Sequence, residues 1–227
     1  MIIAGFEKNS LLDYPGKVSS IIFTYGCNLR CPYCHNPELV IHKLDNERVI
    51  PEEYIFEYLK KRKGLIDALV ITGGEPTLQK DLIPFIKKVK ALGFLVKLDT
   101  NGTFSNIVKD IIDQDIVDYW AMDIKFPIEY LKDYDIDSKE IKRSIKLIMN
   151  SGKDYEFRTT YVKELHDIKD AHGIGEMIKG ANNYYIQNFR KGKTIDPEMS
   201  EKNVFTEDEL KDIKNIISKY VKKVRIR

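Results

Sequence analysis

The sequence predicts an α/β fold in which parallel strands form a sheet and helices cover it from outside. Short apolar runs alternate with amphipathic stretches along most of the 227 residues, and parallel strands need such crossover helices. Unusual polar residues also follow four of the apolar runs, at the strand ends where parallel sheets gather their ligand-binding groups. A doubly wound sheet and a curved barrel both satisfy this pattern, although six units are too few for a closed eight-unit barrel.

The first half of the chain supplies three strand–helix units. The first apolar run, VSSIIFTYG, is rich in β-branched residues and predicts a strand that leads into a cysteine-containing loop. The helix after this loop begins near Pro51, a favoured first helical residue, and Gly93 closes the next helix. The predicted strands of this half are 18–26, 67–74 and 94–102, and the helices are about 51–63, 79–92 and 104–114.

The second half repeats the alternation without a long linker. Ser151 and Gly152 end one helix, and a polar stretch separates the sixth strand from the last helix. We therefore expect one domain over residues 1–227, with a core at about 15–190 and a helical extension at about 200–227. The predicted strands are 117–125, 155–162 and 182–189, and the helices are about 138–150, 167–180 and 206–220.

Composition excludes several classes of protein. The 37 basic and 35 acidic side chains are interleaved, so no electrostatic argument favours a nucleic-acid partner. No apolar run approaches the ~20 residues that a membrane span requires, and the N-terminus lacks the pattern of a secretion signal. Three cysteines cannot all pair within one chain, so we expect a reducing, cytoplasmic location. The basic C-terminal residues KYVKKVRIR are expected to form a solvated end.

All three cysteines, Cys27, Cys31 and Cys34, lie within eight residues. A zinc site would need a fourth ligand, which His35 or His42 could supply. A [4Fe–4S] cluster fits better, because three thiolates leave one iron without a protein ligand. An open coordination position is typical of a catalytic metal site.

The pattern C-x3-C-x2-C after the first strand, followed by Gly73-Gly74-Glu75-Pro76 after the second, resembles the radical S-adenosylmethionine (SAM) enzymes. The resemblance implies a partial (β/α)6 barrel, in agreement with the six units. It also implies that the free iron is chelated by the amino and carboxylate groups of SAM. In that family the reduced cluster passes one electron to the sulfonium, and the resulting 5′-deoxyadenosyl radical abstracts hydrogen.

Residues 10–39 narrow the resemblance to the glycyl-radical-enzyme activating enzymes, which include the activators of pyruvate formate-lyase and anaerobic ribonucleotide reductase. The resemblance extends over about residues 4–190 and implies a glycyl radical enzyme as protein substrate, most closely an anaerobic ribonucleotide reductase. It also implies a one-electron donor such as flavodoxin or ferredoxin. The matching motifs are Asp13-Tyr14-Pro15-Gly16, Cys34-His35-Asn36-Pro37, Asp99-Thr100-Asn101-Gly102 and Met122-Asp123-Ile124-Lys125.

The same resemblance implies a set of SAM contacts. The glycine loop receives the methionine amino group, and Glu75 helps to balance its charge. Arg158 needs an anionic partner, either the methionine carboxylate or a carboxylate of the barrel. The expected SAM-binding residues are Tyr33, His35, Gly73, Gly74, Glu75, Asp99, Asn101, Asp123, Lys125 and Arg158.

A monovalent cation is a further expectation. Asp99 and Asp123 end neighbouring strands, and two such carboxylates repel each other unless a cation lies between them. The resemblance implies that this cation is held by Asp99, Thr100, Asp123 and the carbonyl of Ala121. In the alternative, Asp99 caps the following turn and Asp123 pairs with Lys125.

Some residues are expected to play no part in chemistry. His42, His166 and His172 are predicted to lie at the surface, and Trp120 and Met122 to pack in the core or the pocket wall.

The chain also departs from the activator branch, which often has a histidine at the end of the sixth strand where this chain has Gln187. The competing hypotheses are a radical SAM enzyme acting on a small molecule, such as a deazaguanine precursor, and a zinc-binding interaction module.

Overall fold

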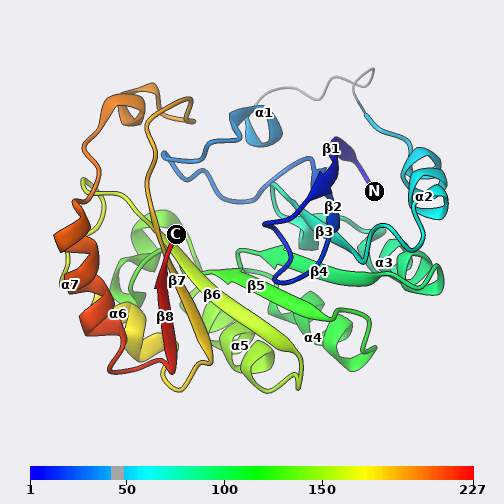
Figure 1. The fold of residues 1–227 in the computed structure, drawn as a ribbon. Coiled ribbons are helices and arrows are strands. Elements are labelled where there is room, and N and C mark those ends of the chain that lie inside the picture. Colours follow the sequence, from blue (N-terminus) through cyan, green and yellow to red (C-terminus); the bar gives the residue numbers. More distant parts are fainter. Residues whose placement is uncertain (42–48) are drawn as a thin grey trace.

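A computed structural model describes residues 1–41 and 49–227 and contains one eight-stranded sheet, whose strands are ordered as in the chain (Figure 1). His42 lies outside the described residues. Strand β1 is antiparallel to β2, and all later neighbours are parallel. The strands are β1 (Ile3–Ser10), β2 (Ser19–Thr24), β3 (Ala68–Gly73), β4 (Leu95–Thr100), β5 (Tyr119–Asp123), β6 (Asp154–Tyr161), β7 (Asn183–Asn188) and β8 (Lys223–Ile226).

The helices follow the strands as the sequence predicts, with ends that differ by a few residues. Figure 1 shows them arranged around the outside of the curved sheet. The six long helices are α2 (Glu52–Lys61), α3 (Leu82–Ala91), α4 (Ser105–Asp113), α5 (Ser138–Met149), α6 (Asp170–Met177) and α7 (Glu207–Ile217). Shorter elements are α1 (Pro37–Val40) and the 3-10 helices η2 (Pro76–Leu78), η3 (Ile128–Tyr134) and η4 (Pro197–Glu201).

The two edge strands were not predicted. β1 has the sequence IAGFEKNS and β8 has KVRI, and neither shows a long apolar run. Charged residues are common on edge strands because they discourage further pairing. The expectation of a purely helical extension at 200–227 is therefore wrong, because β8 pairs in parallel with β7. The last residues are nevertheless mostly exposed to solvent, as expected.

The curved sheet has two faces with different residues. The outer face, which contacts the helices, carries apolar side chains including Ile71, Leu98, Trp120, Phe157 and Ile186. The inner face carries the alternate residues of the same strands, as strand geometry requires. Its charged or hydroxyl-bearing members include Lys97, Asp99, Tyr119, Glu156 and Arg158.

Strands β2 to β6 all end at the same edge, because they run in parallel. The cysteine loop, the glycine loop and the loops after β4 and β5 therefore meet there. No helix among the described residues is long and apolar enough to cross a membrane.

Candidate functional site

A cavity of about 230 Å³ opens at the carboxyl ends of the strands. Its lining includes the three cysteines and every expected SAM-binding residue, whereas Ala121, whose carbonyl was expected to help hold a cation, is not part of it. The complete lining is Cys27, Leu29, Cys31, Tyr33, Cys34, His35, Asn36, Val40, Thr72, Gly73, Gly74, Glu75, Asp99, Thr100, Asn101, Asp123, Lys125, Arg158 and Thr160.

The cysteine loop has little regular structure, and backbone hydrogen bonds hold its shape. Gly26 N donates to the carbonyl of Leu39 at 2.8 Å, and Cys34 N donates to the carbonyl of Cys31 at 3.0 Å. The amide of Leu29 donates to Cys27 Sγ at 3.4 Å. The loop is thus folded around its own thiols.

A segment from the far end of the chain braces this loop. Ile195 N donates to the carbonyl of Cys34 at 3.1 Å, and Asp196 N donates to the carbonyl of Pro32 at 2.9 Å. The His35 ring stacks on Phe189, with ring centroids 5.2 Å apart. No sequence motif marked this brace, because it consists of backbone donors and one aromatic contact.

The environment of the thiols favours metal-bound cysteines over free thiolates. Burial raises the pKa of Cys27 to about 11 and also raises the pKa of Cys31, so both would stay protonated unless a metal displaced the proton. The three cysteines are not in disulfides. The Tyr33 hydroxyl is buried and has no hydrogen-bond partner in the part of the chain described.

A single metal ion would need its ligands close together around one point. Among residues 1–41 and 49–227, no three His, Cys, Asp or Glu side chains are grouped in that way. In a [4Fe–4S] cluster each cysteine binds a different iron, which suits thiols spread around one cavity. Three thiols that line one cavity therefore fit a cluster that takes three protein ligands.

The two glycines of the second loop are required by close contact between backbones. Gly73 has φ +119°, and a Cβ there would lie 2.3 Å from the amide nitrogen of Thr24. A Cβ on Gly74 would lie 2.0 Å from the carbonyl oxygen of Gly26. Side chains at these positions would separate the glycine loop from the cysteine loop. This is a reason for the glycines in addition to the predicted approach to a ligand.

Glu75 joins two loops of the rim. Its side chain is fully buried. Oε1 accepts hydrogen bonds from Thr77 N and from Thr100 Oγ1, at 3.1 and 2.8 Å, and Oε2 accepts one from Asn101 N at 2.7 Å. Burial raises the pKa of Glu75, although the hydrogen bonds oppose the rise. Both carboxylate oxygens thus accept hydrogen bonds from the protein itself. Any role of Glu75 in balancing the charge of a ligand would come in addition to these bonds.

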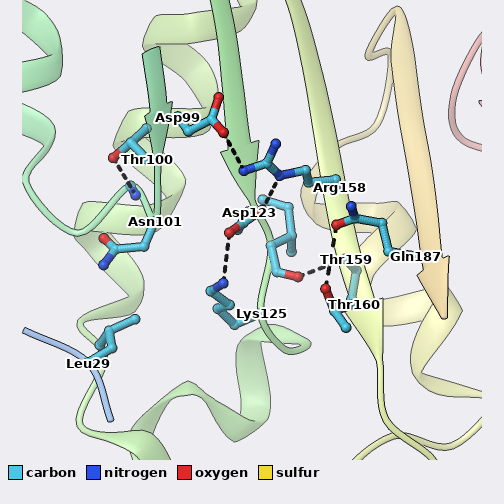
Figure 2. A network of polar contacts seen from close by, with 12 residues as sticks. Leu29, Asp99, Thr100, Asn101, Asp123, Lys125, Arg158, Thr159, Thr160 and Gln187 are labelled. Atoms are coloured by element: carbon cyan, nitrogen blue, oxygen red, sulfur yellow. Dashed lines mark hydrogen bonds and ion pairs between the residues drawn. The ribbon is translucent and has the colours of Figure 1, made fainter. Parts of the chain in front are cut away.

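Arg158 lies between the two aspartates (Figure 2). Its Nη2 is 3.0 Å from Asp99 Oδ2, and its Nε is 2.5 Å from Asp123 Oδ1. Lys125 Nζ lies 2.8 Å from Asp123 Oδ2 and Lys97 Nζ lies 2.9 Å from Asp99 Oδ1. The guanidinium thus supplies the positive charge that the sequence argument assigned to a monovalent cation, and Asp123 pairs with Lys125 as in the alternative.

The pKa shifts follow from this network. Burial alone would raise the pKa of Asp99 and Asp123, but the Arg158 charge, with Lys97 beside Asp99 and Lys125 beside Asp123, lowers both below the ordinary range. Burial alone would lower the pKa of Lys125 and Arg158, but the aspartates raise both. All four groups are therefore charged at neutral pH. A ligand in the cavity therefore meets groups whose charges are fixed and which neither donate nor accept a proton at neutral pH.

Several residues that the sequence singled out lie outside the cavity lining. Gln187 turns toward the site, and its Oε1 accepts a hydrogen bond from Thr160 Oγ1 at 3.5 Å (Figure 2). The prediction that His166 lies at the surface is wrong, since only 4% of it is exposed. Its Nδ1 accepts from Val162 N at 3.1 Å, and its Nε2 lies 2.8 Å from the carbonyl oxygen of Lys125. His172 is exposed as predicted, and Trp120 and Met122 are buried in the core.

Sequence reasoning missed several lining residues. Thr160 lies two positions after Arg158 on β6 and therefore shares its face, so counting along the strand would have found it. Thr72 also lines the cavity, and it lies one residue before the end of β3. The remaining lining residues that the sequence did not single out for the site are Leu29, Asn36 and Val40, which come from the loop and the short helix after β2.

The chain is similar to known proteins of one enzyme superfamily. The sequence profile described as the Radical SAM superfamily matches residues 21–171. A protein of Methanocaldococcus jannaschii with the provisional name of glycyl-radical enzyme activating enzyme is 37% identical over 100% of this chain and 95% of its own length. A 7-carboxy-7-deazaguanine synthase of Koribacter versatilis is 27% identical over 67% of this chain and 65% of its own length.

Solved structures support the fold. The crystal structure of Streptococcus suis SuiB bound to S-adenosylmethionine superposes with a TM-score of 0.69 at 14% identity, over 91% of this chain and 51% of SuiB. At that identity the match concerns the fold alone. The curved parallel sheet is therefore shared with a protein about twice as long.

Proposed function

Because the chain belongs to the radical SAM superfamily and to its glycyl-radical-enzyme activating branch, we propose that it activates a partner enzyme by removing a hydrogen atom from a backbone glycine. We propose an anaerobic ribonucleotide reductase as this partner. The observation that carries the proposal is the full-length match to the Methanocaldococcus jannaschii protein. We place the reaction in the cytoplasm, with a flavodoxin or ferredoxin as the electron donor.

We assign the [4Fe–4S] cluster to Cys27, Cys31 and Cys34, which share the cavity. When bound, the reduced cluster supplies one electron to the sulfonium of SAM, and this step starts hydrogen abstraction from the partner. The brace from Ile195 and Asp196 holds the carbonyls of the cysteine loop. It thereby orients the thiols before the metal is bound.

We assign the carboxylate of SAM to the positive side of the rim, where Lys125 and Arg158 line the cavity. The amino group is assigned to the glycine loop, and the adenine to the neighbourhood of Tyr33 and His35. Asp123 forms ion pairs with Lys125 and with Arg158, and it thereby holds both positively charged side chains in place. A separate monovalent cation at Asp99, Thr100 and Asp123 would have to displace Arg158, so we assign the neutralising role to Arg158.

A small-molecule substrate is the second candidate. It is favoured by the similarity to a deazaguanine synthase, which covers 67% of this chain. The activase is preferred because its relative is more similar and matches the whole chain. A metabolite consumed by the enzyme alone, with no protein partner, would reverse this preference.

The experiment starts with protein purified and reconstituted without oxygen. Iron and sulfide analysis should find about four of each per chain, and reduction should cleave SAM. Mixing with an anaerobic ribonucleotide reductase should then produce a glycyl-radical doublet by electron paramagnetic resonance. The matched control is the reductase with its radical glycine replaced by alanine, which should give no doublet. SAM cleavage without a doublet in any candidate partner would overturn the activase proposal, while stoichiometric zinc without iron would overturn the cluster.

A further inference from the structure

A further buried carboxylate, that of Glu156, lies next to the charged residues of the cavity. Glu156 is fully buried on β6, two positions before Arg158 and on the same face. The Tyr119 hydroxyl donates to its Oε2 at 2.9 Å. Arg158 Nη1 stands 4.0 Å from its Oε1. Arg158 therefore faces three carboxylates, two at the rim and one beneath it.

Arg227, beyond the end of β8, supplies the principal cation for Glu156. Its Nη1 and Nη2 donate to Oε1 and Oε2 at 3.1 and 3.3 Å. The guanidinium carbon lies 3.5 Å from the centroid of the Tyr185 ring, and Arg227 N donates to the carbonyl of Ile186 at 2.9 Å. A backbone bond, a ring and a two-point ion pair thus hold this side chain in one place.

The position of Arg158 depends on the ion pair between Glu156 and Arg227. A buried carboxylate without a cation is costly, so it attracts the nearest positive charge or becomes protonated. If Arg227 is removed, Arg158 is the cation that remains beside Glu156 among the described residues. Its guanidinium would then be drawn from the rim aspartates toward Glu156, away from the cavity.

We propose that Arg227 is a positioning residue for SAM: by neutralising Glu156, it leaves Arg158 bound to Asp99 and Asp123 at the cavity. The inference rests on the proposed function, since it takes Arg158 to belong to the SAM site. It links Arg227, a residue that no motif marks, through Glu156 to the position of Arg158 at the cavity.

The test is the dissociation constant of SAM for the reconstituted protein, measured by anaerobic equilibrium binding. Arg227→Ala should weaken binding roughly tenfold, as expected when a charged contact is misplaced. The double variant Glu156→Gln with Arg227→Ala should restore the affinity to within about threefold of wild type, because the uncompensated charge is gone. A residue with a merely structural role would show no such rescue.

Arg225→Ala is the matched control. Arg225 lies on the same strand and donates to the Tyr185 hydroxyl at 2.7 Å, but it makes no contact with Glu156 in the described structure. Its replacement should leave SAM affinity as it is. Should Arg227→Ala fold poorly, Arg227→Lys keeps the charge beside Glu156 and should stay within about threefold of wild type.

Three outcomes would overturn the inference: unchanged affinity in Arg227→Ala, equal losses in the Arg225 and Arg227 variants, or no rescue in the double variant. They are distinguishable from a failure of the proposed function. If the wild-type protein neither binds nor cleaves SAM, the proposed function itself is wrong, and the Arg227 comparison does not arise.

Discussion

The outer and inner faces of the sheet use neighbouring residues of the same strands for different purposes. On β4, Leu98 packs against the helices, while Asp99 on the other face pairs with Lys97 and Arg158. Apolar burial against helices stabilises the fold. Buried ion pairs contribute little net stability, yet removing one partner is costly. The difference teaches that stability and chemistry can be altered separately, one residue apart.

The largest expected effect is at the cysteine rim of the inner face. Cys31→Ala should abolish cluster binding, because two thiolates remain of the three assigned ligands. Iron, sulfide, brown colour and SAM cleavage should all be lost. Circular dichroism should still report a folded chain, since Cys31 lies in a loop outside the strands and helices. Retention of about four irons per chain would remove Cys31 from the site.

The outer face should respond in the opposite way. Leu98 is fully buried, and Leu98→Ala should lower the free energy of unfolding by about 2–5 kcal/mol. The affinity of the folded fraction for SAM should remain that of the wild type. Urea unfolding and equilibrium binding on the same preparation check both parts. A tenfold loss of affinity would break the separation between the faces.

An inner-face charge sharpens the comparison. Asp123→Asn should keep the cluster but weaken SAM binding about tenfold or more, because Lys125 and Arg158 both lose a partner. The matched control is Asp118→Asn, which removes a similar ion pair to Lys90 at 2.6 Å and does not line the cavity. The control should change stability and leave SAM affinity unaltered. Equal affinities for the two variants would exclude Asp123 from the site.

The smallest effect concerns His166, a buried histidine that lies outside the strands and helices. Its ring stacks on Phe126 of the core, and burial lowers its pKa. The unfolded chain, with a pKa near 6.5, therefore binds more protons as the pH falls, so stability is full above pH ~6.5 and decreases below it. The free energy of unfolding should therefore be smaller at pH 5.5 than at pH 7.5.

This pH effect is measured by urea unfolding at pH 7.5 and 5.5. His166→Gln should reduce the difference between the two values, since no imidazole remains to be protonated. His172→Gln, at an exposed position, should leave the difference as in wild type. If the difference between the two pH values fell in the His172 variant but not in the His166 variant, the pH effect would belong to His172, and this prediction would be wrong.

Much of the fold and rim could be predicted from sequence, for identifiable reasons. The central strands carry apolar residues on the face that the helices cover, and their ends carry motifs that parallel strands bring to one edge of the sheet. β8 could not be predicted, because its residues KVRI are charged at alternate positions and its partner is set by tertiary packing. The direction of Arg158 was equally hidden, since the sequence indicates a need for an anion but not which of several carboxylates satisfies it.

His166 illustrates the same limit. Its burial arises from contacts with Lys125 and Phe126, which are about forty residues away in the chain. A pattern read over a short window cannot detect such contacts. The brace between residues 195–196 and the cysteine loop is a still longer-range contact, and it uses backbone groups that every residue possesses.

That brace has a consequence for the order of synthesis. Each strand pairs with the strand made just before it, so the sheet can assemble progressively as the polypeptide leaves the ribosome. The amides of Ile195 and Asp196, however, reach back about 160 positions to Cys34 and Pro32. The loop that carries the thiols consequently stays unbraced until residues 195 and 196 have been synthesised and folded back onto it.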